Sequence, residues 1–137
     1  MSGNLYGGTT PVVELTPQNF VSDGNNPPTI NPEDDKTGQK YGLLKVYMPT
    51  CPHCVMMHDA MIKLGESLAG QDFATCALNI GNEENRPIAI GLRVSGVPAL
   101  FFIDKQGNLK ELDIKNRTVP DIANALIKQI QTAEQDE

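Results

Sequence analysis

The hydrophobic residues of the chain occur in short blocks that polar turns separate. The block at 42–48 is the most telling, because apolar side chains fall on both of its alternating faces. One face carries Leu44, Val46 and Met48, and the other carries Leu43 and Tyr47 together with Lys45. This pattern is typical of a strand that other elements cover on both sides, as in α/β sheets. It therefore predicts a central, buried strand.

Helices and further strands are predicted on either side of this block. A helix is expected at 55–68, because Met57, Met61, Leu64 and Leu68 form one apolar stripe at helical spacing before Gly70. The other predicted elements are a strand at 12–15, a helical turn at 16–20, strands at 73–79, 99–103 and 109–114, a helix at 86–92 and a helix that starts at Thr118. Parallel crossovers followed by a hairpin indicate an α/β sheet of four or five strands with helices on both faces.

We expect one domain, at 12–131, between a flexible N-terminal segment at 1–11 and an acidic C-terminal tail at 132–137. The segment at 22–40 is rich in proline, asparagine and acidic residues, and Ile30 is its expected apolar anchor. A long irregular stretch of this kind is usually functional or disordered. We interpret it as a surface insertion.

Composition and charge narrow the class of protein. The chain has 137 residues, of which 39% are hydrophobic and 20% charged, as expected for one soluble globular domain. Eleven basic and seventeen acidic residues give a net charge of −6, which argues against nucleic acid or an anionic membrane as the partner. No apolar run is long enough to span a bilayer, and the start does not resemble a signal peptide. We therefore expect a cytoplasmic protein.

Two cysteines, Cys51 and Cys54, stand where the central strand gives way to the helix. The N–H groups of the first helical turn lack intrahelical partners, and the helix dipole adds partial positive charge there. Both effects favour a thiolate over a thiol. A Cys-x-x-Cys pair beside a βαβ pattern is therefore typical of thiol–disulfide exchange.

Three segments together resemble the thioredoxin family. They are 12–20, the motif Cys51-Pro52-His53-Cys54 and 96–102, which contains Gly-Val-Pro at the start of a strand. The first and last resemble protein disulfide isomerase domains and thioredoxins, and the Pro-His dipeptide is similar to that of DsbA-type disulfide oxidants. The resemblance implies a thioredoxin fold, with a mixed sheet of four or five strands and helices on both faces.

The same resemblance implies roles for particular residues. Cys51 is expected to attack substrate and Cys54 to resolve the mixed disulfide, with a cis Val97–Pro98 peptide beside the pair. The residues expected to contact substrate are Thr50, Pro52, Val97 and Pro98. No cofactor is implied beyond the redox-active disulfide Cys51–Cys54. His53, when protonated, would stabilise the Cys51 thiolate and make the pair relatively oxidising.

Three positions depart from the family pattern. Thr50 stands where a tryptophan usually precedes the first cysteine. Asp59 replaces the proline that usually kinks the helix, so the sequence does not decide whether the kink is present. Lys45 stands where the family usually has a buried acid that is thought to shuttle the proton of the resolving cysteine. Under one hypothesis, Lys45 is partly buried, titrates low and supports His53 in favouring thiolates. Under the other, its ammonium extends to solvent at the sheet edge.

The cysteines and histidines also admit other interpretations. A zinc site would use Cys51 and Cys54 with His53, His58 or Cys76, but zinc requires a second pair at ligand spacing. Cys76, on an apolar strand, fits a small buried hydrophobic residue. His58, one turn after Cys54, either approaches that thiol or is a half-buried histidine without a role.

The function indicated is that of a thiol–disulfide oxidoreductase acting on protein cysteines. Its expected partners are protein substrates with thiols or disulfides and an unidentified redox partner, with neither nucleic acid nor membrane; we expect a monomer. The alternative is a thioredoxin-like binding or redox-sensing module that holds a partner protein in the groove beside Pro98. Activity with and without Cys51 distinguishes the two.

Overall fold

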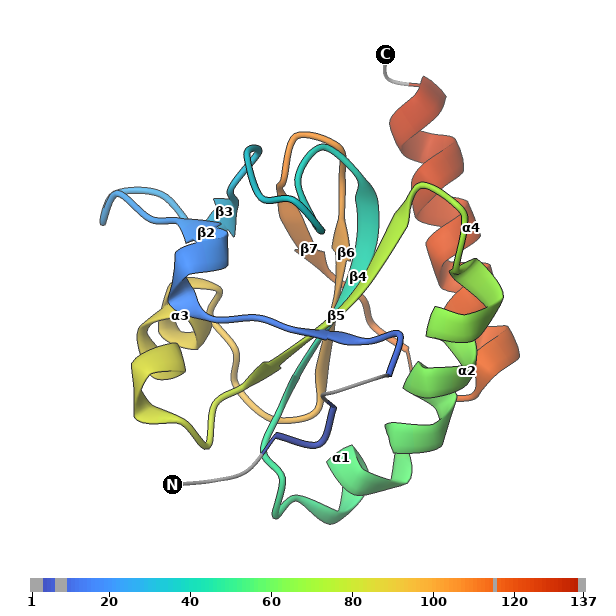
Figure 1. Cartoon of the computed structure of the whole chain (residues 1–137), viewed down its shortest axis with the longest axis horizontal. Helices are drawn as coiled ribbons and strands as arrows, with labels where there is room; N and C mark the ends of the chain where they lie inside the picture. The colour runs from blue at the N-terminus through green and yellow to red at the C-terminus, as the bar shows by residue number, and fades with distance from the viewer. Residues whose placement is uncertain (1–3, 7–9, 115, 136–137) are drawn as a thin grey trace.

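A computed structural model describes residues 4–6, 10–114 and 116–135 of the chain. Its centre is a five-stranded mixed sheet, which Figure 1 shows between two layers of helices. In spatial order the strands are β1 (Val13–Glu14), β5 (Phe73–Asn79), β4 (Tyr41–Tyr47), β6 (Ala99–Ile103) and β7 (Leu109–Glu111). The predicted fold class, an α/β mixed sheet with helices on both faces, is confirmed.

β4 is the central strand, as its pattern predicted. It pairs in parallel with β5 and antiparallel with β6, and all seven of its residues are buried. β1 adds to the far side of β5 in parallel, and β7 closes the other edge as the second arm of a hairpin with β6. Every side chain of β4 therefore points into one of two covered layers.

The two layers are made by different helices (Figure 1). α2 (His58–Leu68) and α4 (Val119–Gln135) cover the face that carries Leu43 and Tyr47. α3 (Arg86–Gly91) covers the opposite face, with Leu44 and Val46, beside the small β2–β3 hairpin (Phe20–Val21 and Thr29–Ile30). Two 3₁₀ turns, η1 (Pro17–Asn19) and η2 (Glu83–Asn85), complete the elements.

The single helix predicted at 55–68 is instead two helices. α1 (Pro52–Met56) ends at Met56, Met57 lies between the two helices, and α2 begins at His58. Met57 has φ −81° and ψ −6°, and this ψ is far from the helical value of about −42°, so the chain bends there. The interruption is therefore present although Asp59 replaces the family's proline. Of the predicted apolar stripe, Met57, Met61 and Leu64 are buried, and Leu68 is partly exposed.

Both predicted terminal segments differ from expectation where the structure describes them. Tyr6, within the expected flexible segment 1–11, is fully buried in the core. α4 continues through Gln135, so residues 132–135 of the expected tail are helical. The residues at 1–3, 7–9 and 136–137 lie outside the described part, and the domain boundaries remain predictions. Among the described residues, no helix has the length and apolar character needed to cross a membrane.

The segment at 22–40 is tied to the sheet through Ile30. Its side chain is 1% exposed, which confirms the predicted anchor. Its N–H donates to the carbonyl of Gly107, in the turn between β6 and β7, at 2.9 Å. Gly107 has φ +86°, and a Cβ at that position would lie 2.6 Å from the Ile30 carbonyl oxygen. The turn therefore needs glycine both for its backbone conformation and for this close approach.

We predict that Gly107→Ala destabilises the fold more than Gly24→Ala does. Gly24 has a similar φ of +83°, but a Cβ added there would meet no atom within 4 Å, so its substitution costs only the left-handed strain of about 1–2 kcal/mol. Gly107→Ala adds a clash with backbone, which we expect to cost about 1–3 kcal/mol more. Urea unfolding of the two variants measures the difference. Equal losses would show that the Ile30 contact does not constrain this turn.

Candidate active site

Cys51 caps the N-terminus of α1, as predicted. Its backbone is extended (φ −79°, ψ 120°), Pro52 occupies the first helical turn, and the Cys51 sulfur accepts the backbone N–H of Cys54 at 3.4 Å. A proline is well suited there because its missing N–H needs no intrahelical partner. The Cys51 sulfur thus lies at the positive end of the helix, although α1 itself has only five residues.

The segment before β6 completes the site. The Val97–Pro98 peptide is cis, as predicted, and the Cys51 thiol donates a hydrogen bond to the Val97 carbonyl at 3.7 Å. Pro98 is buried, while Val97 and Cys51 are partly exposed. The antiparallel pairing of β4 with β6 brings these distant parts of the sequence together. The Cys51 sulfur is therefore partly exposed and lies beside the Val97 carbonyl.

The environment makes the two thiols unequal. Partial burial acts to raise the pKa of Cys51. The opposing effects are larger together and hold this pKa below its usual value. They are hydrogen bonds from the Cys54 thiol and from the backbone amides of Cys54 and His53, and the positive charge of Lys45. Burial, followed by the interaction with Cys51, raises the pKa of Cys54 to about 11. Both are free cysteines in this structure. Cys51 is therefore the thiol of the pair that loses its proton more readily, and Cys54 is the buried thiol that keeps its proton.

Lys45 lies behind the pair and is fully buried, with 0% exposure. Its Nζ donates to the hydroxyl of Tyr6 at 2.6 Å and to the backbone carbonyl of Cys54 at 2.7 Å. Burial lowers the pKa of Lys45 to about 8, although the two cysteines and Glu14 act in the opposite direction. The expectation that its ammonium extends to solvent at the sheet edge is wrong, because β4 is the central strand.

A buried polar network surrounds this lysine, and the sequence pattern did not predict its members. Glu14 on β1 accepts hydrogen bonds from the Tyr47 hydroxyl and, at 3.0 Å, from the backbone N–H of Tyr6. Burial raises the pKa of Glu14, against the effect of these bonds and of Lys45. The available signal was a carboxylate inside the apolar run at 12–15; nothing in the sequence marked Tyr6.

His58 contacts Tyr6 through its ring. The two rings are stacked, with centroids 4.9 Å apart and an interplanar angle of 17°. The Nδ1 atom of His58 is buried and has no hydrogen-bond partner among the described residues. Of the two alternatives for His58, the structure thus favours a half-buried histidine that packs in the network behind the cysteines.

The remaining predicted residues lie on the exposed side of the site. Thr50, Pro52 and His53 are exposed. His53 and Met56, which is 78% exposed, line a shallow hollow against the loop before α4, at Asn116 and Arg117. The surface around Cys51 is therefore open and includes a large apolar side chain.

The metal alternative finds no support among the described residues, where no three histidine, cysteine or acidic side chains lie close enough to hold an ion. Cys76 is fully buried in the core on the α3 side of the sheet. Burial raises the pKa of its thiol. The prediction that Cys76 is a small buried hydrophobic residue is confirmed.

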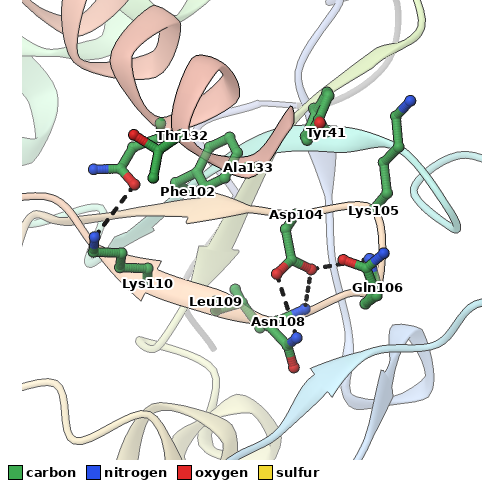
Figure 2. Close-up of a pocket in the computed structure, with 11 residues that line it drawn as sticks. Tyr41, Phe102, Asp104, Lys105, Gln106, Asn108, Leu109, Lys110, Thr132 and Ala133 are labelled. Atoms are coloured by element: carbon green, nitrogen blue, oxygen red, sulfur yellow. Dashed lines mark hydrogen bonds between the residues drawn. The ribbon is translucent and has the colours of Figure 1, made fainter. Parts of the chain in front are cut away.

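Another pocket lies at the opposite end of β4, around Tyr41 and the β6–β7 turn (Figure 2). Its polar side chains bond mainly to neighbouring protein groups. Asp104 accepts from Asn108 and from the amide of Gln106, and Lys110 donates to Gln129 at 3.3 Å. No cysteine or histidine lines this pocket. It offers no reactive group comparable to Cys51.

Solved structures share this fold. The chain superposes on the Trx4 domain of ERdj5 with a TM-score of 0.67 and 16% identity, covering 90% of this chain and 98% of that domain. It matches the J-Trx1 fragment of ERdj5 with a TM-score of 0.66 and 13% identity, covering 88% of this chain and 52% of the fragment. Against full-length ERdj5 the TM-score is again 0.66, but the chain spans only 16% of that protein. At these identities the likeness concerns the fold.

The sequence comparisons address the family. The comparison with curated protein sequences finds no match. The family model described as Thioredoxin matches residues 29–130, which is most of the chain and includes the cysteine motif and the cis proline. The chain therefore belongs to the thioredoxin family.

Proposed function

We propose that this protein is a thiol–disulfide oxidoreductase that acts on the cysteines of other proteins. The observation that carries the proposal is the unequal thiol pair: a half-open Cys51 whose pKa is lowered, beside a buried Cys54 whose pKa is raised to about 11. The thiolate is the nucleophile in disulfide exchange. Of the two thiols, Cys51 is both the more acidic and the more accessible.

In the reducing direction, the Cys51 thiolate attacks one sulfur of a substrate disulfide and expels the other as a thiolate. Cys54, after losing its proton, attacks the Cys51 sulfur and releases the second substrate thiolate. Two electrons pass to the substrate, and the Cys51–Cys54 disulfide remains. The oxidising direction runs the same steps in reverse. The partly exposed Val97 backbone beside Cys51 is suited to pair with an extended substrate chain.

We further propose that the pair is relatively oxidising. Every interaction that stabilises the Cys51 thiolate stabilises the reduced form, and so raises the reduction potential. The hydrogen bonds on Cys51 and the ammonium of Lys45 act in this sense. The roles of His53 and of the substrate-contact residues Thr50 and Pro52 remain predictions, as do the protein partners and the cytoplasmic location.

We predict that the protein catalyses insulin reduction or oxidative refolding of a reduced protein, and that Cys51→Ser lowers the rate at least about 100-fold. Cys54→Ser should retain attack but accumulate a mixed disulfide with substrate, visible on a non-reducing gel. Cys76→Ala is the matched control, because it removes a thiol on the other face of the sheet. Wild-type activity no higher than that of Cys51→Ser would reject the enzyme and favour the binding module.

The redox potential tests the oxidising bias. In a glutathione titration we expect a reduction potential clearly above that of thioredoxin, which is about −270 mV. The potential should lie closer to that of DsbA, which is about −120 mV. The redox state is read from alkylation of the free thiols. A potential at or below the thioredoxin value would contradict the proposal, while leaving the exchange activity itself intact.

We predict that Lys45→Met raises the pKa of Cys51, because it removes a nearby positive charge. The effect belongs to the ammonium form, so it should be full below about pH 8, the pKa of Lys45, and fade above it. The rate of Cys51 alkylation by iodoacetamide as a function of pH measures it. Lys63→Met, at an exposed position of α2, is the control. An unchanged Cys51 pKa would assign Lys45 no electrostatic role.

A further inference from the structure

The N-terminal segment at 4–6 is fixed against the back of the active site by several independent contacts. The Asn4 side chain accepts from Asn79 at 2.9 Å, and the Leu5 amide donates to the Tyr47 hydroxyl at 2.9 Å. The Tyr6 amide donates to Glu14 at 3.0 Å. Figure 1 shows this dark blue segment near the end of β4 where the chain turns into α1. The segment therefore has one defined place in the fold.

Tyr6 fills that place with a ring and a hydroxyl, which have separable tasks. The ring stacks on His58 and meets Tyr47 edge-on, with centroids 5.7 Å apart. The hydroxyl lies 2.6 Å from the Nζ atom of Lys45 and accepts its hydrogen bond. The ring alone would be enough to fill the core. The hydroxyl points instead to a task that concerns the lysine.

Lys45 depends on this hydroxyl because, among the described residues, its Nζ has one other hydrogen-bond acceptor, the Cys54 carbonyl. Its Nζ donates to the Tyr6 hydroxyl and to the Cys54 carbonyl, and it lies 4.9 Å and 5.2 Å from the ring centroids of Tyr6 and Tyr47. A buried ammonium needs such partners to remain charged. Loss of one charge-assisted hydrogen bond favours the neutral amine. Lys45 would then carry less charge near neutral pH.

We propose that Tyr6 is a positioning residue for the thiol pair: its hydroxyl holds the Lys45 ammonium against the Cys54 carbonyl, so that the N-terminal segment sets the charge behind Cys51. This inference rests on the proposed function and adds a regulating element to the same site. Besides Tyr6, the titratable groups around Lys45 are Glu14 on β1, Tyr47 on β4, Cys51 and Cys54 at α1 and, stacked on Tyr6, His58 on α2. Asp59 acts on Tyr6 from α2.

The test is Tyr6→Phe in the full chain, which keeps the ring and removes only the hydroxyl. We expect the pKa of Lys45, followed through its ¹³Cε resonance, to fall by about 1 from its value of about 8. Near pH 7.5, midway between the two pKa values, Lys45 would be mostly charged in the wild type and mostly neutral in the variant. Cys51 alkylation should then slow about two- to threefold near this pH and be unchanged at pH 5.5, where Lys45 is charged in both.

A second background separates positioning from simple packing. In Lys45→Met, the further change Tyr6→Phe should leave Cys51 alkylation unaltered, because the residue through which Tyr6 acts is gone. Tyr41→Phe is the matched control, since it removes a buried tyrosine hydroxyl at the far end of β4. An equal effect of Tyr6→Phe with and without Lys45, or no effect in either, would overturn the proposal.

One measurement requires no variant. In the wild type, we expect Lys45 to titrate near pH 8. The pH profile of Cys51 alkylation should then show a second step at the same pH. A Lys45 pKa near the ordinary value of about 10.4 would overturn the inference. Failure of the proposed function is seen separately, in the insulin and refolding assays. If the protein is active but Tyr6→Phe does not change Cys51 alkylation, only this inference is rejected. If Tyr6→Phe changes Cys51 alkylation as expected but the protein is inactive in both assays, the inference is supported and the enzyme is rejected.

Discussion

A single buried ammonium, on Lys45, constrains much of the structure around the cysteine pair. An unpaired charge in an apolar layer is strongly unfavourable, so the fold must surround it with acceptors and ring faces. These come from distant parts of the chain: Tyr6 from the N-terminal segment, Tyr47 from the same strand and the Cys54 carbonyl from α1. Glu14 then joins β1 to this group through Tyr47. The packing behind the active site is therefore organised as much by charge as by apolar contact.

β4 is both the central strand of the sheet and the strand that leads into the cysteine motif. β4 is buried on both faces and hydrogen-bonded on both edges, so its end is held in place by β5 and β6. The cysteines follow that end directly, and the cis proline precedes β6. A thiol that must meet a substrate sulfur at a defined angle benefits from rigid support. The sheet therefore holds the cysteine motif in a fixed place, and the chain bends at Met57 before α2 packs on the core.

The sequence allowed most of the fold to be predicted, because the apolar pattern is regular where the elements are. β5 and β6 have the predicted bounds, and the two faces of β4 separate into the two layers as expected. Cys51, Cys54 and Pro98 were found through a local motif and a resemblance. Tyr6 and Glu14 could not be found in this way, since their importance comes only from contacts across the sheet. A lone tyrosine in a glycine-rich segment resembles a flexible end until the buried lysine that it contacts is placed.

The asymmetry of the thiols also bears on the direction of the proposed reaction. In a mixed disulfide between Cys51 and a substrate, two attacks compete. Burial, the largest cause of the raised pKa of Cys54 in the reduced pair, persists in the mixed disulfide and makes Cys54 a poor nucleophile near neutral pH, so the proposed reaction disfavours reduction of the substrate. A second substrate thiol can instead attack the substrate sulfur and expel Cys51, whose lowered pKa makes it a good leaving group. That outcome leaves a new disulfide in the substrate. If the pair acts as proposed, the lowered pKa of Cys51, to which Lys45 contributes, thus favours oxidation through the leaving group as well as through the stability of the reduced pair.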